Sequence, residues 1–501
     1  MRKSKAKRKQ PTPQKTIIRR EYAAAQGGRL TSDWMAAGTS QDSELYSSLT
    51  TLRNRSRQMI RDNPHAANLR RIIQDNVVGT GIGIQCQILN KNGVSDDRLN
   101  NQIEEAWKEW SEKETCHTAG QLCLSDLLRL VIGAVFQDGE AFIRKVPMAF
   151  GGGKIPLALE IIEPDLIFDQ GVSIYQSRNH TVRLGVEVDE WNRPVAYWMR
   201  RAHPGDMSFV GQSVSGAGLR RIPADEIEHL YLIERWPQTR GTPWMHSVLR
   251  RMRDMGGYTE SELVAARASA NVLGFIERQD MTPDEMQEDP RKREQTIASE
   301  PGEIRRLYGG ETFTGFAPSR PNSNLDPFMR YMLREVAAGV GVSYESLSRD
   351  YSQSNYSSSR LALLDDRNLW RVLQGWLIRN YLTPIYRTWL DAAVLSGVLD
   401  IPDYFSNKKR YQAVRFKPRG WSWVDPQKEV QAYALAVANG FMSRSDVIAA
   451  IGNGQDREDV DKAIKRDREG AAALGLQFDP TIKQSSPGGK ADETNLNDAG
   501  Q

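Results

Sequence analysis

Hydrophobic residues recur at helical spacing along several stretches of the chain. From Glu44 to Gln74, Leu, Ile and Met stand three or four positions apart, and Asn63-Pro64 interrupts the repeat. Because proline ends or bends a helix, this stretch predicts a kinked helix or a helical hairpin. Similar spacing predicts further helices over residues 99–110, 125–136, 244–270, 327–340, 361 onward, 425–439 and 456–469. Ser125 is the expected N-cap of one of them, and Thr383-Pro384 is expected to bend another.

Shorter stretches rich in β-branched residues predict strands separated by Gly, Pro and Asn-rich turns. The expected strands cover residues 141–146, 157–162, 182–188, 195–199 and 226–233, and residues 77–89 are expected to form a strand or a hairpin. Residues 344–360 hold seven serines and three tyrosines and are expected to form a loop. We expect no packed structure in residues 1–43, 278–302 and 481–501, which are polar and lack periodicity. The whole pattern predicts an α+β fold, and 501 residues are enough for two to four domains.

The formal net charge of +4 is divided unevenly along the chain. Nine Lys and Arg residues lie in the first twenty positions, which contain no acid, so residues 21–501 carry a net charge of about −5. A slightly acidic body argues against a protein that coats nucleic acid with one broad basic face. The basic arm is either a solubilising tail or a segment that contacts a partner.

Several classes of protein are excluded by composition. The most apolar run, Leu130 to Phe136, is seven residues long, whereas a membrane-spanning helix needs about twenty, so no membrane association is expected. No apolar segment follows the N-terminal charges, which argues against a secretory signal. Cys86, Cys116 and Cys123 cannot all pair with one another, which favours a reducing compartment such as the cytosol.

A search for catalytic or metal-binding motifs finds little. Gly79 to Gly83 lacks the strand-then-helix order of a dinucleotide site, and Gly151 to Lys154 lacks the Ser or Thr of a phosphate loop. Cys116-His117 with Cys123 does not match a common zinc module, so no metal and no cofactor is expected. Carboxylates do cluster in three places, Asp138/Glu140, Glu163/Asp165 and Asp365/Asp366. Twelve tryptophans indicate either large packed interfaces or a large core.

A series of short segments resembles, in order, the lambda-type family of tailed-phage portal proteins. The segments include Asp62-Asn63-Pro64, Asp138-Gly139-Glu140, Ile162-Glu163-Pro164-Asp165, Arg193-Pro194-Val195-Ala196-Tyr197-Trp198, Ile222-Pro223-Ala224-Asp225-Glu226-Ile227 with His229, Arg240-Gly241, Ala337-Ala338-Gly339, Asn355-Tyr356-Ser357-Ser358 with Arg360, and Asp425-Pro426. The resemblance runs from about residue 45 to residue 470. It implies a ring, usually of twelve subunits, at one capsid vertex, through which double-stranded DNA is packaged and ejected without sequence-specific contacts.

The same resemblance implies partners, location and parts. The expected partners are terminase, then the head-to-tail connector, with major capsid and scaffold proteins around the ring. The protein is expected in the virion, after synthesis in the host cytoplasm, and is not expected to be an enzyme. The implied parts are a basic arm (1–43), a wing (44–243), stem helix 1 (244–272), a clip (273–325), stem helix 2 (326–343), a tunnel loop (344–360), a long kinked helix returning to the wing (361–424), a crown (425–480) and a tail (481–501).

Two sets of residues become candidates under this interpretation. Arg349, Asn355, Tyr356 and Arg360 are expected to line the DNA channel, in a loop whose Ser, Asn and Tyr side chains can make weak, exchangeable contacts to phosphate oxygens. An ordinary solvated turn is the open alternative for that loop. Arg250, Arg251 and Arg253 are expected to make ion pairs between subunits, because a closed ring joins two different faces of each copy. The alternative function is a nucleic-acid-processing enzyme with a metal site built from scattered acids such as Asp138, Glu140 and Asp365.

Overall fold

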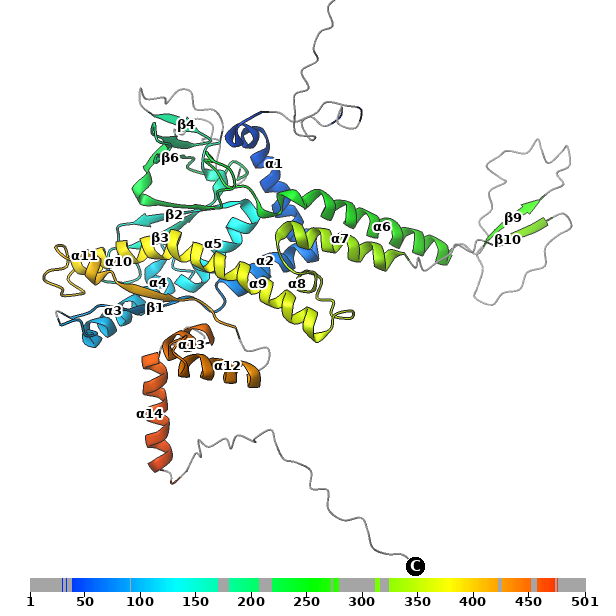
Figure 1. Ribbon diagram of the computed structural model, residues 1–501. Helices are drawn as coiled ribbons and strands as arrows, with labels where there is room; N and C mark the ends of the chain where they lie inside the picture. Colours follow the sequence, from blue (N-terminus) through cyan, green and yellow to red (C-terminus); the bar gives the residue numbers. More distant parts are fainter. Residues whose placement is uncertain are drawn as a thin grey trace, which may run out of the picture.

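The protein is a mixed α+β chain with a large body, a projecting helical pair and a separate group of helices near the C-terminus (Figure 1). The structure is a computed structural model of the whole chain. It describes residues 38–90, 92–169, 180–206, 219–271, 274–278, 311–315, 324–421, 426–451 and 457–473, together with Arg29, Asp33 and Gly475. The expectations for residues 1–37, 279–302 and 481–501 lie outside the described residues. In the described part, no helix is long and apolar enough to span a membrane.

The first two helices meet at the predicted Asn63-Pro64 break. Helix α1 (Gln41–Asp62) begins at Ser40, whose side chain caps it, a few residues before the expected Glu44. Helix α2 (Pro64–Val77) has proline in its first turn, and the Asn63 side chain accepts from the backbone N–H groups of His65 and Ala66. Asparagine caps a helix well, and proline loses nothing in a first turn, so local chemistry alone explains the break.

Helix α5 (Leu124–Asp138) packs against α2 in the main core, with α3 (Asp97–Trp110) and α4 (Lys113–Cys116) preceding it in the chain. The expected N-cap at Ser125 is wrong. Cys123 stands at the N-cap position, and its side chain makes no capping hydrogen bond. Helix α5 ends at Gly139, whose left-handed backbone (φ 89°) is the common helix stop.

Two antiparallel sheets enclose the second core of the body. The first has the order β3-β2-β8, built from β2 (Glu140–Val146), β3 (Ala158–Ile162) and β8 (Ile227–Tyr231). The second has the order β4-β5-β6-β7, built from β4 (Thr181–Arg183), β5 (Val186–Val188), β6 (Pro194–Met199) and β7 (Arg220–Pro223). Short 3-10 turns, Pro164–Leu166 and Ala224–Glu226, follow β3 and β7. Phe142, Ile162, Val186 and Tyr197 are among the residues buried in this core.

Two strand predictions need correction. The single strand expected at 182–188 is two strands, because Leu184 and Gly185 both have positive φ and turn the chain. Residues 77–89 do not form a hairpin: α2 continues to Val77, and only β1 (Gly83–Cys86) is a strand. Its partner is β11 (Val414–Lys417), which comes from the other end of the chain, so local pattern could not reveal the pairing.

A long helical pair projects from the body (Figure 1). A 3-10 turn, Trp244–Ser247, leads into α6 (Leu249–Asn271), and α7 (Leu325–Val340) returns beside it to end at Gly341, which has a left-handed backbone. The Tyr258 and Phe328 rings meet at a centroid distance of 4.9 Å and join the two helices. A two-stranded ribbon, β9 (Gly274–Arg278) with β10 (Glu311–Gly315), lies beyond the far end of the pair.

The predicted loop at 344–360 is largely wrong, because helices occupy both of its ends. Helix α8 (Tyr344–Ser348) follows α7, and α9 (Tyr356–Leu377) begins five residues before the expected Leu361. A π-helical turn, Ile378–Leu382, then leads into α10 (Thr383–Leu395), so the expected irregularity at Thr383-Pro384 is present. Helix α11 (Lys408–Tyr411) precedes β11.

The final group comprises α12 (Pro426–Ala438), α13 (Arg444–Ile451) and α14 (Arg457–Ala473). Helices α12 and α14 match the predicted ranges closely, whereas α13 was not expected. In Figure 1 this group stands apart from the body, below strand β1.

Candidate functional site

The body contains a buried cluster of charged side chains that joins five parts of the chain. Helix α1 contributes Arg53 and Arg57, the α5–β2 junction contributes Asp138 and Glu140, and the turn after β3 contributes Asp165. Strand β8 contributes His229, and the segment leading to α6 contributes Arg240. We refer to these seven residues as the charge cluster.

Glu140 lies at the centre of the charge cluster and is fully buried. Its carboxylate oxygens accept from Arg240 at 2.6 and 2.8 Å, from Arg53 at 2.8 Å and from the backbone N–H of Gly241 at 3.0 Å. Burial alone would raise its pKa, but Arg240, His229 and Arg53 outweigh burial and hold the pKa of Glu140 far below its usual value. Glu140 is therefore ionised and acts only as an acceptor.

Two further acids and a histidine complete the charge cluster. Arg57 contacts Asp138 at 2.7 Å and Asp165 at 2.6 Å, and Arg53 contacts Asp165 at 3.2 Å. Burial opposes ionisation of Asp165, yet the charges of Arg53 and Arg57 lower its pKa. Nε2 of His229 lies 3.1 Å from Glu140 and must carry the hydrogen, because an ionised carboxylate cannot donate. Burial lowers the pKa of His229, so its ring is neutral at pH 7.

This geometry does not assemble the metal site of the enzyme alternative. The carboxylates of Asp138 and Glu140 are engaged by arginines, and Asp365 lies exposed on α9. Its neighbour Asp366 accepts from Ser343 and Ser346 and fixes the start of α8. Asp138, Glu140 and Asp366 therefore have structural partners in place of a metal ion.

Among the described residues, one group of potential metal ligands does converge: Glu163, Asp165 and His203. Nη2 of Arg57 already lies 3.3 Å from Glu163 and 2.6 Å from Asp165. Because this guanidinium supplies the positive charge that the carboxylates need, we assign no cation site there.

The charge cluster unites segments that sequence reasoning singled out separately. Asp138-Gly139-Glu140, Glu163-Pro164-Asp165, His229 and Arg240-Gly241 all meet in it. Sequence reasoning missed Arg53 and Arg57, which lie four residues apart on the inward face of α1. The available signal was the helical repeat itself, since Leu45, Leu49, Arg53, Ser56 and Ile60 are the buried residues of α1.

The predicted channel residues lie at or beside the connection between α8 and α9. Arg349 ends α8 with a left-handed backbone (φ 59°), is exposed, and donates to Asn68 of α2 at 3.4 Å. Asn355 is the N-cap of α9 and forms a capping box with Ser358, so its side-chain oxygen accepts from the backbone of α9. Tyr356 is exposed, whereas Arg360 lies 3.9 Å from Glu429 of α12.

Hydrogen bonds hold the start of this connection in place. Asp350 accepts from Tyr344 at 2.9 Å and from the backbone N–H of Ser352 at 3.0 Å. Its bonds to Ser352 lower the pKa of Asp350 to about 2. Asn68 donates to the carbonyl oxygens of Ser346 and Leu347 and ties α8 to α2. The segment is thus an anchored turn with an exposed outer surface.

The three arginines of α6 that were expected at a subunit interface are exposed but are not equivalent. Nε of Arg251 contacts Glu335 of α7 at 3.0 Å and links the two helices of the pair within one chain. Arg250 and Arg253 lie on the exposed surface of α6, on either side of buried Met252. Arg250 and Arg253 are therefore better placed than Arg251 for contacts outside the chain.

Comparison with known proteins identifies relatives over nearly the whole chain. A family model described as phage portal protein, lambda family, matches residues 27–374. A probable portal protein of Halomonas phage phiHAP-1 is 31% identical over 477 residues, covering 93% of this chain and 90% of the relative. Portal protein B of Escherichia phage lambda is 22% identical, covering 94% of this chain and 96% of the relative. Among solved structures, the neck of an empty gene transfer agent particle is similar at a TM-score of 0.44 and 15% identity, covering 83% of this chain and 95% of that chain.

Proposed function

Because this chain belongs to the lambda family of phage portal proteins, we propose that its copies assemble into a closed ring at one vertex of a tailed-phage capsid. Double-stranded DNA enters through this ring during packaging and leaves through it during ejection. The ring has twelve subunits, docks terminase first and the head-to-tail connector later, and contacts major capsid and scaffold proteins. The observation that carries this proposal is the match to a portal-protein relative across 93% of the chain.

The projecting helical pair supports the proposed division into parts. We assign the stem to α6 and α7, the clip to the segment that contains the β9–β10 ribbon, and the wing to the two sheets with α1 to α5. Helices α12 to α14 form the crown. Apolar side chains that a single chain leaves exposed on the stem pair, including Leu263, Val264 and Tyr331, are consistent with neighbours on both sides.

The α8–α9 connection is the proposed point of contact with DNA. In Figure 1 it lies between the stem pair and the crown helices. Arg349, Tyr351 and Tyr356 are exposed there, and the first turn of α9 adds the positive end of a helix. A few such contacts attract phosphate groups without neutralising many of them. Strong neutralisation would give tight, salt-sensitive binding and would stall a moving duplex.

Portal proteins are structural components of the phage head and not enzymes, so the alternative of a nucleic-acid-processing enzyme is not supported. The arginine partners of Asp138 and Glu140 agree with that conclusion.

Electron micrographs and solution mass of the purified chain test the proposal together. We expect rings with a central hole and a mass that is a multiple of 56.5 kDa. A stable monomer with metal-dependent nuclease activity would overturn the proposal and restore the enzyme alternative. A closed ring of a number other than twelve would correct the subunit count alone.

A further inference from the structure

We propose that helices α12, α13 and α14 are completed by the same helices of the adjacent copy, and that this part of the chain gains its stable packing only in the ring. The inference rests on the proposed ring, and it concerns one surface: the outward face of α12 with Phe441 after it. We refer to Val430, Ala434, Val437 and Phe441 as the crown stripe.

The crown helices have almost no core of their own in one chain. Among the described residues from 426 to 473, only Ala471 is buried, and neither α12 nor α13 contributes a residue to a hydrophobic core cluster. Helices of 13, 8 and 17 residues are marginal in water by themselves, because most helix stability in proteins comes from packing. These helices therefore need apolar contacts that the described part of the chain does not supply.

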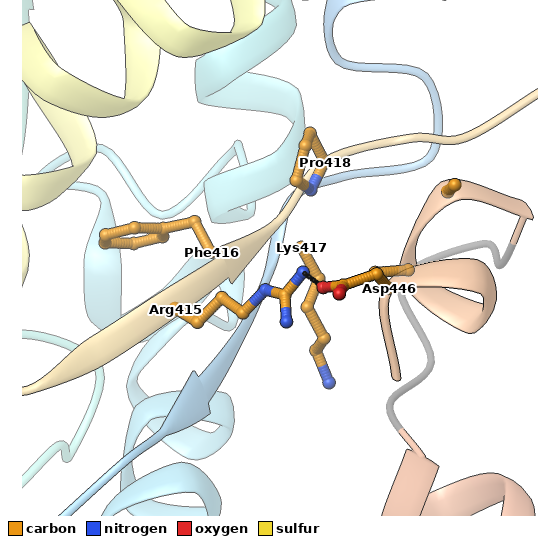
Figure 2. Close-up of a pocket in the computed structure, with 7 residues that line it drawn as sticks. Arg415, Phe416, Lys417, Pro418 and Asp446 are labelled. Atoms are coloured by element: carbon orange, nitrogen blue, oxygen red, sulfur yellow. Dashed lines mark ion pairs between the residues drawn. The ribbon is translucent and has the colours of Figure 1, made fainter. Parts of the chain in front are cut away.

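Polar contacts hold the crown to the body. Arg415 of β11 lies 3.5 Å from Asp446 of α13, and Gln85 of β1 donates to Glu458 of α14 at 2.7 Å. Between β11 and α13 there is a cavity of about 260 Å³ rather than packed side chains (Figure 2). Phe416, Ala449 and Ala450 line it together with the Arg415–Asp446 ion pair. Exposed ion pairs contribute little to stability, so this junction does not replace a core.

The crown stripe has the spacing of a helix-packing surface. Its residues follow one another at steps of four, three and four, and Val430, Val437 and Phe441 are 43%, 37% and 86% exposed. The adjoining face of α12, with Glu429, Tyr433 and Ala436, is the half-buried one. One face of α12 thus meets its own chain, and an apolar face is left for another helix.

Phe441 is held in place by backbone bonds rather than by side-chain contacts. Its N–H donates to the Ala436 carbonyl at 2.9 Å, and the N–H of Gly440 donates to the Val437 carbonyl at 3.1 Å. In this Schellman turn the residue at the Phe441 position commonly packs back onto its own helix. Phe441 is 86% exposed and therefore does not pack back in this way. Its phenyl group points outward from a turn that backbone hydrogen bonds hold in place.

An adjacent copy is the partner that fits this surface. A ring brings every crown beside two identical crowns, so the crown stripe lies next to the interface that the stem pair already requires. Helix α14 carries five basic and five acidic residues, so two copies can approach without net repulsion. The crown helices of each copy bury few apolar residues by themselves, and each copy can supply apolar contacts to the next.

Amide hydrogen exchange on the full-length protein tests this inference. Ring and single-subunit fractions are separated by size and compared segment by segment. We expect amides of α12 and α14 to exchange at least about tenfold more slowly in the ring, whereas amides of α2 and α5 in the main core are protected equally in both fractions. In Val437→Glu, crown protection in the ring falls to the level of the subunit. The control is Leu395→Glu on α10, an apolar site away from the crown that is 73% exposed, against 37% for Val437, and it leaves crown protection unchanged.

The possible outcomes separate the inference from the proposed function. Rings whose crown amides exchange as fast as those of the subunit, or a Val437→Glu ring with full protection, would overturn the inference alone. A second test compares full-length single subunits with single subunits that end at residue 475. If only the truncated subunits lose crown protection, the tail of the same chain covers the crown stripe, and this result would also overturn the inference. Loss of rings in Val437→Glu but not in Leu395→Glu would support it. Absence of rings in the unaltered protein would refute the proposed function.

Discussion

Arg240 and Glu140 form a double ion pair in which neither side chain is exposed to solvent. Nη2 of Arg240 lies 2.6 Å from one carboxylate oxygen and Nε lies 2.8 Å from the other. The pair joins β2 to the segment that leads into stem helix α6. Beside it Gly139 and Gly241 pass so closely that a Cβ on Gly241 would lie within 2.0 Å of the Gly139 carbonyl oxygen. The segment that leads into α6 is therefore fixed to β2 by buried charge and by backbone contact.

Arg53→Ala is expected to destabilise the folded subunit by about 3–5 kcal/mol. Removing Arg53 takes one cationic partner from both Glu140 and Asp165, and removing one member of a buried ion-pair network is costly. The matched control is Arg61→Ala on the same helix, where an exposed pair with Asp62 is lost at a cost of at most about 1 kcal/mol. Denaturant unfolding of single subunits measures both. Equal stability of the two variants would contradict a stabilising role for the charge cluster.

Stability is expected to fall in two steps as the pH is lowered. Burial lowers the pKa of His229 in the folded chain, so as the pH falls the unfolded chain binds a proton at this histidine first, near pH 6.5. The stability that comes from the neutral, buried His229 is therefore present above that pH and is lost below it. The lowered pKa values of Glu140 and Asp165 add a second loss as the pH falls below about 4–5, where these acids titrate in the unfolded chain.

Melting temperatures between pH 8 and pH 3 check this prediction. His229→Gln should reduce the first decline and keep the second, because glutamine can donate to Glu140 but does not titrate. Part of the first decline remains, because burial also lowers the pKa values of His65 and His117. His246→Gln, an exposed site, is the control and should keep both declines. A His229→Gln profile identical to that of the unaltered protein would rule out His229 as the source of the first step.

Local chemistry made part of this fold predictable. The Asn63-Pro64 break, the stem helices and most strands follow from spacing and from turn residues that act within a few positions. The pairing of β1 with β11 does not, since it joins distant parts of the chain. Arg53 was not predicted to be buried, because a rule based on periodicity treats a charged residue as exposed. The acids that pair with it, Glu140 and Asp165, lie on other elements.

The serine-rich segment misled for a different reason. Serines that suggest a loop here stabilise helices: Ser358 completes the capping box of α9, and Ser346 bonds to Asp366, which also accepts from the α8 cap, Ser343. Composition reports the hydroxyl groups but not their partners. Whether the exposed remainder of this segment contacts DNA stays a prediction.

Arg349→Glu is expected to lower DNA packaging or retention severalfold while rings remain intact. Arg349 is exposed, and its weak bond to Asn68 leaves the end of its side chain able to turn towards a duplex. A reversed charge there repels phosphate groups. DNA content per filled head and ring mass in solution are the two measurements, with Arg61→Glu on the outer surface of α1 as the control.

Arg360→Glu should differ from Arg349→Glu in one respect. Its partner Glu429 belongs to α12, so reversal also places two acids together and weakens the contact between α9 and the crown. We expect faster hydrogen exchange in α12 in this variant only. Loss of rings in either variant would show that the residue lies at a subunit interface and not in the channel.

Arg250 and Arg253 are expected to serve ring assembly more than Arg251 does. All three are exposed, but Arg251 is already engaged by Glu335 within its own chain. The double variant Arg250→Glu/Arg253→Glu should shift the mass in solution from rings towards single subunits, most strongly at low salt, where like charges repel over a longer range. Arg251→Glu should leave assembly closer to normal and mainly loosen the α6–α7 pair. Ring assembly that persists in the double variant but fails in Arg251→Glu would contradict this assignment. It would show that the Arg251–Glu335 pair within one chain is what ring assembly requires.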